Sequence, residues 1–270
     1  MFRGVILSEA KNLAIKRIND LRDPSSPSAP QDDTHWAFFS NRLALARCGA
    51  TVIVNYSRRA DAAEETVAQI ENLGGRALAV RADVTDESQV KDLVQRALQA
   101  YGGLDLLVAN AGGPTEICPT PELSSEDWDR GLGLNCKSVF YCVKHVIARL
   151  PDHHGRIIIN SSISARSGGG PGMITYAAAK GALNNMVRGW AKELAPRGIT
   201  VNAIAPGVIW TRIHEKHTDP AEYKKLIQRI PLGRDGMPDD CVGAVLLLAA
   251  PEGSYITGQI IEINGGLQMP

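Results

Sequence analysis

A doubly wound, parallel α/β sheet in a single domain is the fold class that the sequence predicts, on three observations. Short apolar runs rich in β-branched residues alternate with amphipathic stretches, the order that parallel strands joined by helices require. Hydroxyl and carboxylate side chains stand at the starts of two helical stretches, where free N–H groups need acceptors. The chain has 270 residues, a length that single α/β domains commonly reach.

The elements follow in order along the chain. The apolar runs predict strands at residues 51–55, 76–81, 104–108, 156–161, 200–204 and 259–263. The amphipathic stretches between them predict helices at residues 61–73, 87–101, 125–150, 176–195 and 239–249. Capping residues at 85–88 and 124–127 indicate where the second and third of these helices begin.

The first 40 residues break this pattern. Residues 1–22 are polar and weakly amphipathic, and residues 23–30 are rich in proline and serine, which is typical of a linker or a disordered tract. We therefore expect an atypical, poorly ordered segment at residues 1–40, followed by one folded domain at residues 41–270.

Charge, hydropathy and cysteine content exclude several function classes. Lys plus Arg and Asp plus Glu both number 29, so no net charge attracts nucleic acid or an anionic membrane. The longest apolar runs fall far short of the ~20 residues that cross a bilayer. The five cysteines form no CxxC pair, which fits reduced thiols. We expect a cytoplasmic protein without nucleic-acid or membrane partners.

A tyrosine and a lysine four residues apart, Tyr176 and Lys180, form the most informative pattern in the chain. Residues at this spacing project from one face of a helix. Phenol ionises near pH ~10 in water, so a tyrosine needs a nearby cation to act as an acid or base at neutral pH. Ser162 lies upstream and offers a hydroxyl for a substrate carbonyl. The set predicts carbonyl reduction, with the oxygen protonated as hydride reaches carbon.

Further motifs occur in a fixed order, and with them the chain resembles the short-chain dehydrogenase/reductase family from about residue 42 to 266. The motifs are Asp83-Val84, Asn110-Ala111-Gly112, Asn135, Ser161-Ser162, Tyr176 with Lys180, Pro206-Gly207 and Asn264-Gly265-Gly266. The resemblance is to 3-oxoacyl-[acyl-carrier-protein] reductases and to sugar dehydrogenases of this family. It implies a Rossmann-like catalytic domain and NAD(P)H-dependent reduction of a ketone.

The resemblance also implies roles for the catalytic residues. Tyr176 would be the acid–base, and Lys180 would lower its pKa and hold the nicotinamide ribose. Ser162 would bind the carbonyl oxygen, and Asn135 would position a water of a proton relay. Ser164 is the reserve for Ser162, because the loop before Tyr176 is slightly long for the family.

The cofactor site that the resemblance implies is spread over the whole chain. Its residues are Asn55, Tyr56, Ser57, Arg58, Asp83, Val84, Asn110, Ala111, Gly112, Tyr176, Lys180, Pro206, Gly207, Ile209 and Thr211. No acidic residue ends the strand at 51–55, where a carboxylate would bind the ribose of NAD and repel a 2′-phosphate. Neutral donors and two arginines stand there instead, so we predict NADPH as the preferred cofactor and NADH as the alternative.

The chain departs from the family at its start. Relatives open with an apolar strand and a glycine-rich turn that brings backbone N–H groups to the cofactor pyrophosphate. Residues 1–50 contain glycine only at Gly4 and Gly49, so the first strand and the turn are atypical or missing. Three explanations stay open: a gene defect such as a frameshift, a targeting segment, or a substitute first strand at Val5-Ile6-Leu7.

Two function classes follow from these opposite signals. The first is an NADPH-dependent reductase of a 3-oxoacyl-type ketone, with a sugar or polyol dehydrogenase as the alternative in substrate class. The second is a pseudoenzyme or oligomerisation scaffold that cannot bind the dinucleotide.

The sequence also carries expectations about partners. The substrate is expected to be a small carbonyl compound or an acyl thioester, under a lid formed by residues 213–231. The helical stretches at 125–150 and 176–195 pair across subunits in relatives, which favours a homotetramer. His214 and His217 lack a third ligand of suitable spacing, so no metal site is predicted.

Overall fold

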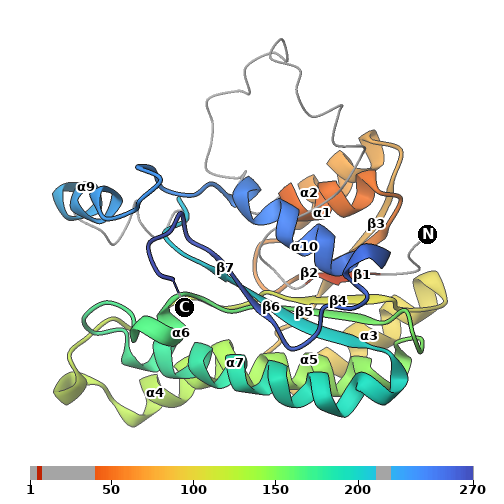
Figure 1. Cartoon of the computed structure of the whole chain (residues 1–270). Coiled ribbons are helices and arrows are strands. Elements are labelled where there is room, and N and C mark those ends of the chain that lie inside the picture. Colours follow the sequence, from red (N-terminus) through yellow and green to blue (C-terminus); the bar gives the residue numbers. More distant parts are fainter. Residues whose placement is uncertain (1–4, 8–39, 211–219, 270) are drawn as a thin grey trace.

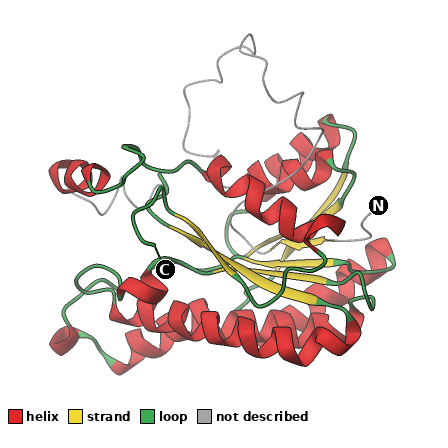
Figure 2. Ribbon diagram, viewed as in Figure 1, coloured by secondary structure: helices red, strands yellow, loops and turns green. Residues whose placement is uncertain are grey.

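A seven-stranded parallel sheet forms the centre of the molecule, as the computed structural model shows for residues 5–7, 40–210 and 220–269 (Figures 1 and 2). The strands are β1 (Val5–Leu7), β2 (Thr51–Tyr56), β3 (Arg76–Arg81), β4 (Leu106–Ala109), β5 (Arg156–Asn160), β6 (Thr200–Pro206) and β7 (Ile260–Ile263). Their spatial order is β3-β2-β1-β4-β5-β6-β7. The order reverses beside β1, so the predicted doubly wound topology is confirmed and its switch point lies between β1 and β4.

The first strand is present, although it has only three residues. Val5 pairs in parallel with Val52 of β2 on one side and with Leu106 of β4 on the other. Without β1 the facing edges of β2 and β4 would leave their N–H and C=O groups unpaired in the middle of the sheet. The substitute first strand is therefore the arrangement that the structure has, while residues 8–39 lie outside the described residues. The division of the chain at residue 40 stays a prediction.

Helices cover both faces of the sheet. They are α1 (Ser40–Arg47), α2 (Ala60–Asn72), α3 (Glu87–Tyr101), α4 (Ser125–Leu132), α5 (Ser138–Val146), α6 (Ser164–Ser167), α7 (Ile174–Leu194), α9 (Pro220–Gln228) and α10 (Val242–Ala249). Figure 1 shows α1, α2 and α10 on one face and α3, α5 and α7 on the other.

Alternate residues of β2 and β4 pack into two apolar cores on opposite faces of the sheet. Ile53 and Leu107 pack into the core under α3, α5 and α7. Their neighbours Val52 and Leu106 pack into the core under α1 and α10. All four side chains are fully buried. A strand that buries both faces reads as a continuous apolar run, which is why these strands were predictable.

The helix predicted at residues 125–150 is wrong as a single helix. The structure divides it into α4, a π turn at Gly133–Lys137, α5 and a 3₁₀ turn at Ile147–Arg149. π turns often lie at functional sites, and this one holds Asn135. The predicted caps are confirmed: Asp86 accepts from the N–H groups of Ser88 and Gln89 at the start of α3.

Candidate functional site

A large cleft lies at the carboxyl edge of the sheet. It has a volume of about 1450 Å³, and the loops that follow β2, β3, β4, β5 and β6 all contribute to its wall. Pockets for drug-sized ligands span about 300–1,000 Å³. The cleft therefore has room for a ligand as large as a dinucleotide together with a small substrate.

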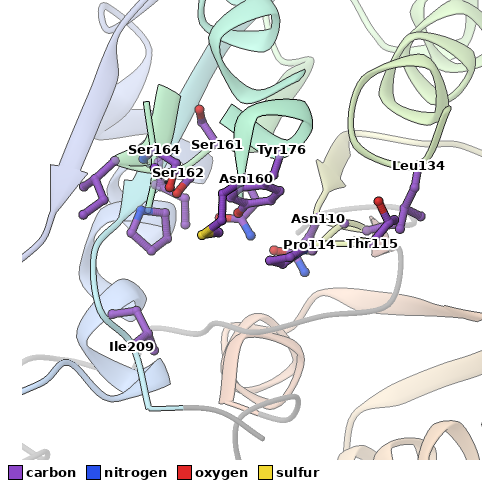
Figure 3. Close-up of a pocket in the computed structure, with 18 of the residues that line it drawn as sticks. Asn110, Pro114, Thr115, Leu134, Asn160, Ser161, Ser162, Ser164, Tyr176 and Ile209 are labelled. Atoms are coloured by element: carbon purple, nitrogen blue, oxygen red, sulfur yellow. Dashed lines mark hydrogen bonds between the residues drawn. The ribbon is translucent and has the colours of Figure 1, made fainter. Parts of the chain in front are cut away.

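The predicted tyrosine and serine meet in this cleft. Tyr176, in the first turn of α7, lies close enough to Ser162, which follows β5, for the serine hydroxyl to lower the pKa of the tyrosine. The Ser162 oxygen also accepts the Ser164 N–H at 3.1 Å, which fixes its orientation. Figure 3 shows these serines and Tyr176 grouped together, across from Pro114 and Thr115. The choice of Ser162 over Ser164 stays a prediction.

Burial governs the acidity of Tyr176. The hydroxyl is removed from solvent, and this desolvation raises the pKa of Tyr176 above its ordinary value. The nearby Ser162 hydroxyl favours the phenolate and offsets part of the rise in the pKa of Tyr176. In the protein alone, the tyrosine is thus held protonated at neutral pH, ready to give a proton away.

Lys180 lies one helical turn after Tyr176 and is 2% exposed. Its ammonium donates to the Asn160 carbonyl at 2.7 Å and stands 5.6 Å from the centre of the Tyr176 ring. Burial lowers the pKa of Lys180 to about 8. The cation faces the ring and a carbonyl, and Lys180 does not contribute to the pKa shift of Tyr176. That Lys180 lowers the tyrosine pKa stays a prediction for the cofactor-bound protein.

The buried charge of Lys180 predicts a stability that depends on pH. The folded pKa of about 8 lies below the unfolded value of ~10.4. Between these values the unfolded chain binds more protons, so the free energy of unfolding rises with pH. From pH 7 to 9.5 we expect wild type to gain about 2 kcal/mol relative to Lys180→Met, at about 1.4 kcal/mol per pH unit.

Urea denaturation of both proteins at pH 7, 8 and 9.5 measures this difference. Lys91→Met, at an exposed position of α3, is the control for removing a lysine. If the difference in the free energy of unfolding between wild type and Lys180→Met stays constant over the series, burial does not destabilise the charged form of Lys180.

Asn135 is fully buried in the π turn and uses its side chain to hold backbone. Its Oδ1 accepts the Gly113 N–H at 2.8 Å, and its Nδ2 donates to the carbonyls of Gly113 and Gly131, both at 3.0 Å. The amide thus ties the loop after β4 to the end of α4. With these three partners satisfied, its proposed part in a water relay stays a prediction.

Gly112 passes close to both of these catalytic candidates. Its φ is +148°, and a Cβ there would lie 2.6 Å from the Asn135 Oδ1 and 3.3 Å from the Lys180 Nζ. Only glycine has room at this point and adopts this backbone conformation readily. The glycine therefore lets the loop after β4 pack closely against the Asn135 amide and the Lys180 ammonium, while Gly112 itself lines the cleft.

Most of the predicted cofactor residues are brought together by the fold. Those that line the cleft are Asn55, Ser57, Arg58, Asp83, Val84, Asn110, Ala111, Gly112, Tyr176, Pro206, Gly207 and Ile209. Tyr56 and Lys180 are not among the lining residues, and Thr211 lies outside the described residues. Asn55 donates its amide to the carbonyls of Val80 and Ala82 at 3.2 and 3.0 Å, so it joins the ends of β2 and β3.

Several residues of the cleft were not anticipated from the sequence. They are Pro114, Thr115, Leu134, Asn160, Met173 and Gln268. Pro114 and Thr115 directly follow the Asn110-Ala111-Gly112 motif, so proximity in sequence would have found them. Gln268 reaches the cleft only through the tertiary fold and carries no local signal, whereas Leu226 and Arg229 belong to the lid that was expected at residues 213–231.

No helix among the described residues has the length and apolar character to cross a membrane. Over residues 41–210 and 223–269, no three His, Cys, Asp or Glu side chains gather as metal ligands. His214 and His217 lie outside the described part of the chain.

Comparison with known proteins gives consistent matches. A family described as Enoyl-(Acyl carrier protein) reductase matches residues 43–268. The 3-oxoacyl-[acyl-carrier-protein] reductase FabG of Thermotoga maritima is 40% identical over 225 residues, which cover 83% of this chain and 90% of that protein.

Solved structures agree with the sequence matches. A mutant of a Serratia marcescens short-chain dehydrogenase/reductase superposes with a TM-score of 0.83 at 31% identity, covering 99% of this chain and 98% of that one. A blue fluorescent protein from a metagenomic library, in complex with NADPH, gives a TM-score of 0.78 at 34% identity, covering 83% and 90% of the two chains.

Proposed function

The chain belongs to the short-chain dehydrogenase/reductase family of NAD(P)-dependent oxidoreductases, and we propose that it reduces a 3-oxoacyl-type ketone to a secondary alcohol with NADPH. The observation that carries the proposal is the contact of Tyr176 with Ser162 in the cleft, with the buried cation of Lys180 beside the tyrosine ring. This arrangement supplies a proton donor, a carbonyl ligand and a positive charge at one place.

The mechanism follows from the protonation states of these groups. The hydroxyls of Ser162 and Tyr176 bind the carbonyl oxygen of the substrate. NADPH, when bound, supplies the hydride that reduces the carbonyl carbon. Tyr176 gives its phenolic proton to the oxygen as negative charge develops there. Lys180 stabilises the phenolate that remains, and a proton from solvent restores the tyrosine.

The cofactor would be held by the residues that follow the strands. Gly112 and its neighbours Asn110 and Ala111 would face the nicotinamide half, with Lys180 toward its ribose. Asp83 and Val84 would flank the adenine. The position of Asn110, Ala111 and Gly112 in the cleft wall, with Gly112 packed against Lys180, supports this placement.

A preference for NADPH is supported by the charges after β2. Arg58 is exposed at the edge of the cleft, and Arg81 donates to the Ser57 carbonyl at 3.2 Å. Arg59 also lines the cleft but is within 3.8 Å of Asp61, so Arg58 is the better-placed cation for a 2′-phosphate. Arginine suits phosphate because its planar fork donates two hydrogen bonds.

We expect Arg58→Ala to weaken NADPH binding about tenfold or more and to leave NADH binding within about twofold, since a charged hydrogen bond contributes about 1.5–3 kcal/mol. Titration of nicotinamide fluorescence with each cofactor measures both constants. Arg96→Ala, at an exposed position of α3, is the matched control. An equal loss for both cofactors would contradict a 2′-phosphate contact.

The substrate class is tested by activity. A 3-oxoacyl thioester and a set of sugars and polyols, assayed in the reduction and oxidation directions with NADP(H), separate the proposed reductase from the dehydrogenase alternative. Turnover of the thioester that disappears in a Ser162→Ala and Tyr176→Phe double variant supports the proposal. Turnover of polyols alone would reassign the substrate.

The scaffold alternative separates from the reductase at cofactor binding. The comparisons give it no support, and binding of NADPH by the full-length protein would exclude it.

We also propose a cytoplasmic homotetramer that uses α5 and α7. Phe140 of α5 is 41% exposed, a large apolar side chain that a subunit contact would cover, and light scattering after size exclusion measures the assembly.

A further inference from the structure

Helix α9 lies at the carboxyl end of the sheet, at the same end of the molecule as α4 and α6 (Figure 1). Leu226 within it and Arg229 just after it line the large cleft. The position of α9 therefore decides where an apolar side chain and a cation stand in the wall of the cleft.

Two contacts of one side chain fix α9 to the rest of the protein. The Tyr223 hydroxyl donates to the Asp235 carboxylate at 2.7 Å. Its ring packs edge-on against Trp210, with ring centres 5.1 Å apart. Burial and the Asp235 carboxylate both raise the pKa of Tyr223, so the hydroxyl keeps the proton that it donates.

Asp235 is itself held in a rigid turn. Arg234 makes two hydrogen bonds of 2.7 Å to the carboxylate of Asp240 and donates to the Asp235 carbonyl at 2.8 Å. Trp210 belongs to the same unit, because its N–H donates to the Gly236 carbonyl at 2.8 Å. A Cβ on Gly236 would lie 2.4 Å from the Ile209 side chain, so the two segments are in close contact.

Ile209 lines the cleft, one residue before Trp210. The turn that receives the Tyr223 hydrogen bond is thus joined directly to the cleft wall. Tyr223 therefore connects α9 to this wall, and its contacts set the position of Leu226 and Arg229 relative to the rest of the cleft lining.

We propose that Tyr223 and Asp235 are a pair of positioning residues that latch α9 over the cleft and set the affinity for the ketone substrate without taking part in the chemistry. The effect on substrate affinity rests on the proposed reductase function. The latch rests only on the contacts of Tyr223, Asp235 and Trp210.

Tyr223→Phe tests the latch, because it removes the hydroxyl and keeps the ring on Trp210. We expect KM for the ketone to rise about tenfold, the equivalent of one hydrogen bond to a charged acceptor. We expect kcat and the Kd of NADPH to stay within about twofold. Tyr255→Phe is the matched control, since Tyr255 is 100% exposed.

Hydrogen exchange of the amides of residues 223–228 provides a readout that needs no substrate. We expect exchange in Tyr223→Phe to be about tenfold faster, because a segment held by fewer contacts opens more often. Asp235→Asn keeps an acceptor and is expected to fall between wild type and Asp235→Ala. The double variant Tyr223→Phe/Asp235→Ala should exchange no faster than the faster single variant if the two residues act as a pair.

The outcomes separate the latch from the proposed function. Unchanged exchange in Tyr223→Phe, or additive effects in the double variant, would overturn the latch. Faster exchange with an unchanged KM would overturn its role in substrate affinity. If wild type reduces no ketone, the proposed function fails, and exchange in Tyr223→Phe still decides the latch.

Discussion

Tyr176→Phe is expected to lower kcat for ketone reduction by about 10³-fold, within the range of about 10²–10⁴ that proton transfer from a positioned side chain contributes. The ring and its contact with Lys180 remain, so the shape of the cleft and the buried cation are unchanged. The proton for the developing alkoxide then has to come from water. NADPH binding is expected to stay within about twofold, because the hydroxyl acts on the substrate.

Steady-state kinetics and fluorescence titration on the same preparation measure the two quantities. Tyr101→Phe is the control, since burial raises the pKa of Tyr101 as well, but its ring lies in α3 under Arg76. A loss of less than tenfold in kcat would mean that another group protonates the oxygen. An equal loss in NADPH affinity would place the hydroxyl on the cofactor.

Asn135→Leu is expected to lower the free energy of unfolding by about 3–5 kcal/mol. The substitution leaves the Gly113 N–H and the carbonyls of Gly113 and Gly131 without the partner that they have in the structure. Each buried group left unpaired costs about 1–3 kcal/mol, and the branched side chain of leucine fills a site that is shaped for an amide. The lost hydrogen bonds are those that hold the loop after β4, which lines the cleft, to the end of α4.

Urea denaturation measures the effect. Asn185→Leu is the control, because Asn185 lies on the exposed side of α7 and surface substitutions change stability by about 0.5 kcal/mol or less. A destabilisation of Asn135→Leu below about 1 kcal/mol would mean that the three hydrogen bonds are replaced by others.

The sheet was predictable because its strands bury both faces. β5 carries Ile157, Ile158 and Ile159 in succession, all buried. A run of β-branched apolar residues of this kind has few interpretations other than a buried strand. β1 was only one of three explanations for the first residues, because three apolar residues in a polar segment do not by themselves specify a strand. Its place in the sheet depends on the edges that β2 and β4 present.

The interruption of the predicted helix at 125–150 was beyond the sequence for a related reason. The π turn at Gly133–Lys137 lies where the Asn135 amide binds the loop after β4. This contact joins residues 22 positions apart, so the helical periodicity of the sequence does not reveal it.

The chemistry of the site was only partly predictable. The spacing of Tyr176 and Lys180 placed both on one face of α7, but the orientation of the ammonium toward the Asn160 carbonyl depends on how β5 packs under the helix. Tyr223 and Asp235 carry no motif at all, and their contact exists only because α9 folds back toward the turn after residue 233.

Transfer of deuterium from NADPH labelled at C4 of the nicotinamide tests the central claim most directly. Full-length protein is incubated with a 3-oxoacyl thioester and each of the two C4-deuterated stereoisomers, and the product is examined by mass spectrometry and NMR. We predict deuterium at the carbinol carbon from one stereoisomer only, and its loss in Tyr176→Phe. A folded protein that transfers no deuterium from either stereoisomer would contradict the assignment of this chain as a ketone reductase.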